Sequence, residues 1–124
     1  MFQIATHKTF QDGQVIFQEG THGDWIYFVE EGMVEISRNI NGKKIVIVTL
    51  KQGEIFGEVA YIGKVPRSAS AIAVGETTVG IINRNFFDKD FNKLSGNFQM
   101  VLKIMALRLK KTTDALIELQ KNLL

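Results

Sequence analysis

Short apolar runs alternate with turn-forming residues through the first 82 positions of the chain. Runs typical of strands occupy positions 4–6, 15–17, 25–29, 33–37, 43–50, 68–74 and 77–82. Glycine-containing turns separate many of them at intervals of about 8–12 residues, a rhythm that indicates a β-sandwich or barrel. The pair Asn41-Gly42 is a two-residue hairpin signal. The pattern therefore predicts a mainly β unit over residues 1–82.

Beyond Asn83 the pattern becomes helical. A long helix is predicted from about Phe98 to Leu124, because good helix formers fill this segment and no proline interrupts it. Either Ser95 or Asn97 can cap its N-terminus.

Two apolar stripes run along this predicted helix. The first has the alternating spacing of 3 and 4 of a heptad seam, at Leu102, Met105, Leu109, Thr112, Leu116, Leu119 and Leu123. The second, which we expect to lie on the β unit, contains Val101, Ile104 and Leu107. If one stripe packs on the β unit and the other on a second copy of the helix, the chain forms a parallel homodimer, which we favour. The alternative is an amphipathic helix that packs only on its own domain.

Composition narrows the class of protein. The 124 residues, of which 45% are hydrophobic, are enough for one domain with a core, and we take 1–124 as that domain. The sequence contains no apolar run of about 18 residues, so no membrane span is expected. Cysteine is absent, which excludes thiolate chemistry and fits a cytoplasmic location. A net charge of +2 gives no reason to expect direct nucleic-acid binding, and two histidines cannot form a three-histidine metal site.

Candidate chemistry is concentrated in residues 56–70. Glu58 and Arg67 lie nine residues apart, and Gly57 lets the backbone approach a ligand closely. Residues 60–62 have the pattern of one helical turn, whose free N–H groups can face an anion. Because Arg67 follows a proline, its backbone is expected to be extended, and its guanidinium can meet a phosphate with two donors. Such a site suits a small ligand with an anion for Arg67 and a hydroxyl for Glu58; the alternative is a solvated turn with a surface ion pair.

The stretch FGEVAYIGKVPRSASA resembles the phosphate-binding cassette of cyclic-nucleotide-binding domains, as found in protein kinase A regulatory subunits and bacterial catabolite activator proteins. Its departure from the family pattern is Tyr61, where leucine is usual. The resemblance implies that Glu58 binds the ribose 2′-hydroxyl and that Arg67 binds the cyclic phosphate. It also implies ligand contacts, through backbone or hydroxyl groups, from Gly57, Val59, Ala60, Ser68 and Ala69.

The same resemblance implies a fold. It predicts a jelly-roll β-barrel, or double-stranded β-helix, over residues 1–82, with the cassette at 56–70. A hinge helix beginning near Arg84 and a long dimerisation helix would then fill residues 83–124. The small residues of 68–73 predict an inner strand that leaves room for a bulky group, which is either a nucleotide or a large aromatic side chain such as Trp25.

Residues 106–113 resemble the central helix of catabolite activator proteins, where a Thr-Ser pair reads the adenine amino group across the dimer. The resemblance implies that Thr112 and Thr113 cap the base, one of them from the partner chain, which favours cAMP. Ser68 points the other way, because a hydroxyl there can contact a guanine amino group, so cGMP stays open. The alternative role of Thr112 is to select the register of a helix seam.

These features predict a ligand sensor and not an enzyme, because no residue of the motif is placed to exchange a proton with Glu58. Binding of cAMP, or of cGMP, would order the cassette and rearrange the long helix with its dimer or partner contacts, and no cofactor is needed. Two alternatives remain: a dimerisation scaffold with a non-functional cassette, and the sensor part of a transcriptional regulator whose DNA-binding domain lies outside this chain.

Overall fold

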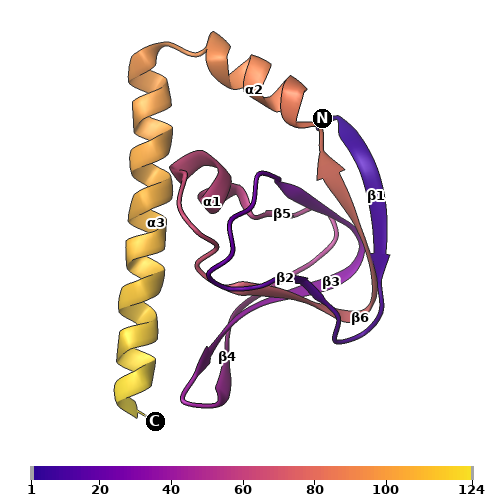
Figure 1. The fold of residues 1–124 in the computed structure, drawn as a ribbon, viewed down its shortest axis with the longest axis vertical. Helices are drawn as coiled ribbons and strands as arrows, with labels where there is room; N and C mark the ends of the chain where they lie inside the picture. The colour runs from indigo at the N-terminus through magenta and orange to yellow at the C-terminus, as the bar shows by residue number, and fades with distance from the viewer. Residues whose placement is uncertain (1, 124) are drawn as a thin grey trace.

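The computed structural model describes residues 2–123 as a sheet of antiparallel strands followed by helices (Figure 1). The strands are β1 (Ile4–Phe10), β2 (Val15–Phe17), β3 (Tyr27–Ile40), β4 (Lys43–Leu50), β5 (Ile55–Phe56) and β6 (Ser70–Ile82). The helices are α1 (Glu58–Gly63), α2 (Arg84–Lys93) and α3 (Gly96–Leu123). The mainly β unit with C-terminal helices that the sequence predicts is therefore present.

The sheet is organised around its two long strands. Its order is β1-β6-β3-β4, and the short strands β2 and β5 pair with β6 and β3 respectively. The ladder is an open path whose end strands, β1 and β4, do not pair with each other. In Figure 1 the strands curve around a common interior, and α1 lies between them and α3.

Strands β3 and β6 correct the sequence prediction, which divided each of them into two strands. Gly32 and Gly75, read as turns, have positive φ angles of 85° and 71° but lie inside continuous strands. The ladder between β3 and β6 shifts register near Gly32, as at a β-bulge. The fully buried Thr77 hydroxyl donates to the Met33 carbonyl at 2.9 Å and accepts from the Met33 N–H at 3.3 Å. These bonds satisfy backbone groups where the ladder is irregular, so the strands continue.

Other local predictions are confirmed. Asn41 and Gly42 have φ angles of 52° and 80°, both left-handed, and connect β3 to β4. The helical part begins at Asn83 as predicted, and the Asn83 Oδ1 caps α2 by accepting hydrogen bonds from the Asn85 and Phe86 N–H groups. Ser95, and not Asn97, caps α3: its hydroxyl accepts from the Phe98 N–H at 3.3 Å. The predicted strand 4–6 extends further, to Phe10.

The core lies inside the curved sheet and continues to the start of the cassette. Tyr27 and Phe56 stack with ring centroids 5.0 Å apart, so β5 is anchored immediately before Gly57. A second buried cluster, of Ile26, Tyr61 and Ile82, joins the sheet to α1. The residues of the main buried cluster are Tyr27, Val29, Val34, Phe56, Ala71, Val79 and Ile81.

The face of α3 that packs on the rest of the domain differs from the prediction. Val101 and Ile104, expected on the β unit, are 49% and 46% exposed. Leu107, expected there too, does approach α1 with its Cδ2 and is 37% exposed. The buried residues of α3 are Ala106 and Ile117. Helix α3 lies close to α1 at this point: a Cβ built on Gly63 would lie 3.3 Å from Leu107 Cδ2 and 3.9 Å from Ala106 Cβ. In this chain the seam residues Met105, Leu109, Leu116, Leu119 and Leu123 are exposed.

Among the described residues, no helix combines the length and the apolar character that a membrane span requires.

Candidate functional site

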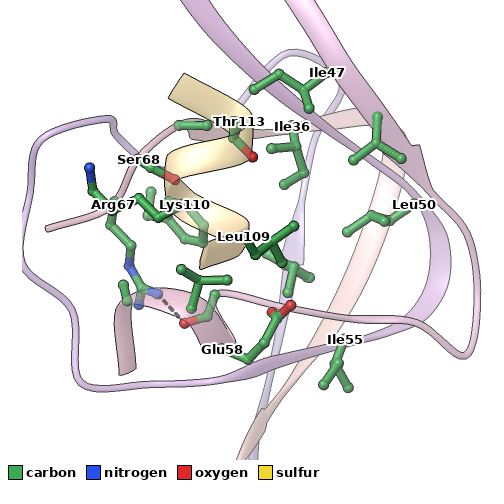
Figure 2. Close-up of a pocket in the computed structure, with 17 residues that line it drawn as sticks. Ile36, Ile47, Leu50, Ile55, Glu58, Arg67, Ser68, Leu109, Lys110 and Thr113 are labelled. Atoms are coloured by element: carbon green, nitrogen blue, oxygen red, sulfur yellow. Dashed lines mark hydrogen bonds between the residues drawn. The ribbon is translucent and has the colours of Figure 1, made fainter. Parts of the chain in front are cut away.

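A cavity of about 220 Å³ lies where the cassette, the sheet and α3 meet. Figure 2 shows Glu58 and Arg67 on one side of it, apolar residues of the sheet on another, and a turn of α3 across it. Every predicted cassette residue lines the cavity: Gly57, Glu58, Val59, Ala60, Arg67, Ser68 and Ala69. The structure therefore brings together residues that are up to 12 positions apart in the sequence, together with a helix that begins at Gly96.

Arg67 is buried, with 4% of the residue exposed. Its Nη1 donates to the Gly57 carbonyl at 2.7 Å and its Nη2 donates to the Trp25 carbonyl at 3.0 Å. Its guanidinium also lies 4.3 Å from the centre of the Phe17 ring, a cation–π contact. The two donors that we expected to meet a phosphate thus contact backbone carbonyls.

The charge of Arg67 is not neutralised by an ion pair with any described residue: none places a carboxylate oxygen within 4 Å of its guanidinium. Its buried Nε–H has no hydrogen-bond acceptor in the described part of the chain. Desolvation lowers the pKa of Arg67, although nearby Tyr27, Asp24 and Glu58 act in the opposite direction. A buried cation with an unused donor is costly unless an anion joins it.

Two glycines make room for the guanidinium. A Cβ on Gly57 would lie 2.7 Å from Arg67 Nη1, and a Cβ on Gly23 would overlap the guanidinium itself. Gly57 also has a φ of 84°, which disfavours any other residue. Gly57 belongs to the cassette and was predicted as a site residue, whereas Gly23 was not, because it lies 44 positions before Arg67 in a different turn.

Glu58 opens α1 and faces the same cavity. Desolvation raises the pKa of Glu58 above its ordinary value of 4.5, against the opposing effects of its backbone N–H and of Arg67. Among the described residues it has no side-chain ion pair. The Glu58 carboxylate can therefore accept further hydrogen bonds, and a hydroxyl of a ligand in the cavity is one group that could donate to it.

The third side of the cavity comes from α3, where one of the two predicted threonines lines the cavity and the other does not. Thr113 lines the cavity together with Leu109 and Lys110. Thr112 is exposed and does not line it in this chain. Leu109 and Lys110 were not predicted as site residues, because a leucine and a lysine at helical spacing carry no chemical signature of their own.

The bulky group that faces the small residues of β6 is not Trp25. This side chain belongs to a residue that is 45% exposed, and it lines a different hollow, near Gly23 and Asp24. Ser68 and Ala69 instead border the cavity itself. Within β6, Ala71 belongs to the buried cluster of Tyr27 and Phe56, and Phe17 packs against that cluster. Core aromatics therefore fill the space beside Ala71, and Ser68 and Ala69, which precede β6, face the cavity.

Tyr61, the departure from the family pattern, connects the cassette to α2. Its hydroxyl donates to Asp88, and its ring contacts Phe87 edge-on at 5.4 Å. The sequence analysis noted Tyr61 but found no partner for its hydroxyl. Among residues 2–123, no group of three metal-ligating side chains gathers at one point.

Comparison with known proteins agrees with this geometry. The family profile described as "Cyclic nucleotide-binding domain" matches residues 7–93. The chain is 33% identical over 97 residues to the cAMP-dependent protein kinase type II regulatory subunit of Drosophila melanogaster, covering 77% of this chain and 25% of that protein. The curated relatives that it matches are much longer, and it spans between 9% and 29% of their length.

Solved structures show the same fold. An EAL enzyme in its cAMP-bound form gives a TM-score of 0.83 at 28% identity, over 95% of this chain and 32% of that chain. The same enzyme in its cGMP-bound form gives 0.78 at 30% identity, over 85% and 28%. The catabolite activator protein of Thermus thermophilus gives 0.67 at 27% identity, over 93% and 53%. These similarities confirm the predicted jelly-roll β-barrel class with a C-terminal helix, although the sheet is not closed.

Proposed function

The chain belongs to the family of cyclic nucleotide-binding domains, and on that premise we propose that its cavity binds a cyclic nucleotide monophosphate as a signal. One observation carries the proposal: the cavity is lined by Arg67, a buried cation whose Nε–H has no acceptor in the described part of the chain, and by Glu58, a desolvated carboxylate that no described side chain pairs with. A cyclic nucleotide supplies both missing partners in one molecule. Its phosphate carries one negative charge for Arg67, and its ribose hydroxyl can donate to Glu58.

The remaining cassette residues surround this pair. Gly57 and Ala60 lie next to Glu58, and Ser68 and Ala69 lie next to Arg67, so we assign them to the sugar and phosphate. Val59 lines the same cavity and completes the proposed binding set. The module then acts by binding and not by catalysis, and it needs no cofactor.

We assign the base to the α3 side of the cavity. Thr113 has a hydroxyl that can accept from the adenine amino group, which supports cAMP as the signal. The same hydroxyl can donate to a guanine carbonyl, and Ser68 can contact the guanine amino group, so cGMP is the competing ligand. The similar EAL enzyme has been captured with each of the two nucleotides.

Binding would move α3. The cavity of about 220 Å³ is smaller than the roughly 300–1,000 Å³ usual for small-molecule sites. A nucleotide therefore requires side chains of α3 that line the cavity, such as Leu109 and Lys110, to move aside. We infer that α3 reports the ligand through these contacts.

The exposed seam on α3 supports a homodimer as the form in which this shift is read. Met105, Leu116, Leu119 and Leu123 are 47–82% exposed in the single chain. Thr112 lies among them; it is exposed and does not line its own cavity, so in a dimer it is available to the partner's base. We keep the cytoplasmic location as part of the proposal, because the chain has no cysteine.

Titration calorimetry of the purified chain with cAMP and cGMP tests the proposal, with 5′-AMP as the control that lacks the cyclic phosphate. We expect saturable binding of at least one cyclic nucleotide and much weaker binding of 5′-AMP. Absence of binding by both cyclic nucleotides would reject the sensor function and favour the dimerisation scaffold. Light scattering of the same samples measures the mass and tests the dimer.

A further inference from the structure

Arg38 lies where three separate parts of the molecule meet. It belongs to β3, and only 15% of its side chain is exposed. Its Nε donates to the Ser68 carbonyl at 2.8 Å, and its Nη2 donates to Asp114 Oδ1 on α3 at 2.7 Å. A longer contact of 3.5 Å joins its Nε to Glu19, which follows β2. One guanidinium thus contacts the sheet, the end of the cassette and the long helix.

The geometry of the guanidinium makes this a fixed connection. Nε–H and one N–H of Nη2 point from the same edge of a planar, rigid group. The Ser68 carbonyl and the Asp114 carboxylate must therefore lie side by side for both hydrogen bonds to form. Since Ser68 directly follows Arg67, the carbonyl that Arg38 holds belongs to the same short backbone segment as the side chain proposed for the phosphate.

Asp114 in turn fixes the part of α3 that covers the cavity. Its second oxygen, Oδ2, accepts from Lys110 Nζ at 2.9 Å, one helical turn earlier. Lys110 lies one helical turn before Asp114 and Thr113 lies next to it, and both line the cavity. Desolvation raises the pKa of Asp114, but the hydrogen bonds from Lys110 and Arg38 outweigh it, and the net pKa is lowered. The carboxylate is therefore ionised and paired on both oxygens.

We propose that Arg38 is a positioning residue that couples the cassette to α3: it holds the helix in register over the nucleotide cavity by joining the Ser68 carbonyl to Asp114. This inference rests on the proposed function and assigns a specific side chain to the link between ligand and helix. Its consequence is that nucleotide affinity depends on an ion pair that does not touch the nucleotide.

The test uses Asp114→Asn as its main variant, because Asp114 lies on a helix surface where the substitution leaves the fold intact. Arg38→Met is the second variant and removes both hydrogen bonds. The matched control is Lys44→Met, which breaks the 2.6 Å ion pair between Lys44 and Glu35 within the sheet and does not involve α3. Thermal unfolding of every variant establishes that it is folded.

Two readouts separate the parts of the proposal. Because the chain has no cysteine, nitroxide labels can be placed with Lys43→Cys on β4 and Lys121→Cys on α3, and diluted with unlabelled protein to exclude distances between protomers. Pulsed electron spin resonance then reports the position of α3 without ligand. Calorimetry with cAMP and cGMP reports the affinity.

We expect Asp114→Asn to broaden the label distance and to weaken nucleotide binding about tenfold, the loss of one charge-assisted hydrogen bond, while Lys44→Met leaves both unchanged. At high salt, where the Debye length falls to about 3 Å at 1 M, the difference in affinity between wild type and Asp114→Asn should shrink.

An unchanged distance and affinity in Asp114→Asn would overturn the inference, and so would a broadened distance with unchanged affinity. If the wild-type chain binds neither nucleotide while the distance still broadens in the variant, the sensor function fails, but the role of Arg38 in holding α3 stands.

Discussion

Replacement of Arg67 by methionine separates the two roles that its position allows. In the ligand-free chain the guanidinium makes two hydrogen bonds to carbonyls and one cation–π contact. Hydrogen bonds of a charged donor contribute about 1.5–3 kcal/mol each, and the contact with Phe17 about 0.5–2 kcal/mol. Burial of a cation without a counter-charge costs several kcal/mol in the opposite direction. We therefore expect Arg67→Met to change the free energy of unfolding of the ligand-free chain by at most about 2 kcal/mol.

The effect on ligand binding should be much clearer, because Arg67 is the fully buried cation of the proposed site, and Lys110, the other cation that lines it, is paired with Asp114. Loss of its charge-assisted contacts weakens binding by at least about 1.5 kcal/mol, which is more than tenfold in Kd. At a cAMP concentration 100 times the wild-type Kd, the ligand stabilises the wild-type chain by about 2.7 kcal/mol. At the same concentration a variant with tenfold weaker binding gains only about 1.4 kcal/mol.

Urea unfolding with and without cAMP measures both quantities in one assay. The control is Arg84→Met, since the Arg84 side chain is half exposed and pairs with Asp24 and Asp88 outside the cavity. It should retain the full ligand-induced stabilisation. Undiminished stabilisation of Arg67→Met by cAMP would refute the assignment of Arg67 to the phosphate and would leave it only a structural role beside Gly57.

Three further predictions concern the rest of the site. Because desolvation raises the pKa of Glu58 in the folded chain, ionisation of Glu58 destabilises the fold at neutral pH. Glu58→Gln should therefore stabilise the ligand-free chain at pH 7, with a gain that vanishes below about pH 4, and should weaken nucleotide binding. A variant that is no more stable than wild type at pH 7 would contradict this. Tyr61→Phe removes the hydroxyl that donates to Asp88 and should lower the free energy of unfolding by about 1 kcal/mol; an unchanged urea midpoint would show that this bond contributes nothing. Thr113→Val should change the ratio of cAMP to cGMP affinity at any protein concentration, whereas Thr112→Val should change it only where the chain dimerises. Equal effects of the two threonine variants in dilute, monomeric protein would oppose the assignment of Thr113 to the base within its own chain.

Much of the site could be predicted because its chemistry is contiguous in the sequence. Glu58 and Arg67 are separated by a short loop, so the spacing that brings both to one cavity is a local property. Turn and cap residues are equally local, and Asn41-Gly42 and Ser95 are found in the predicted roles. The prediction failed at Gly32 and Gly75, because a positive φ angle is compatible with a bulge as well as with a turn.

The sequence by itself determined the family, the order of the elements and the residues of the cassette, since these depend on short-range spacing and backbone preference. Only the tertiary structure decided how Arg67 is held and which face of α3 lies on the domain. Apolar residues on several sides of α3 left that face open, and the close approach of Ala106 to Gly63 and the pairing of Asp114 with Arg38 selected it. These contacts join residues 43 and 76 positions apart, and no local pattern encodes a distance in space between them.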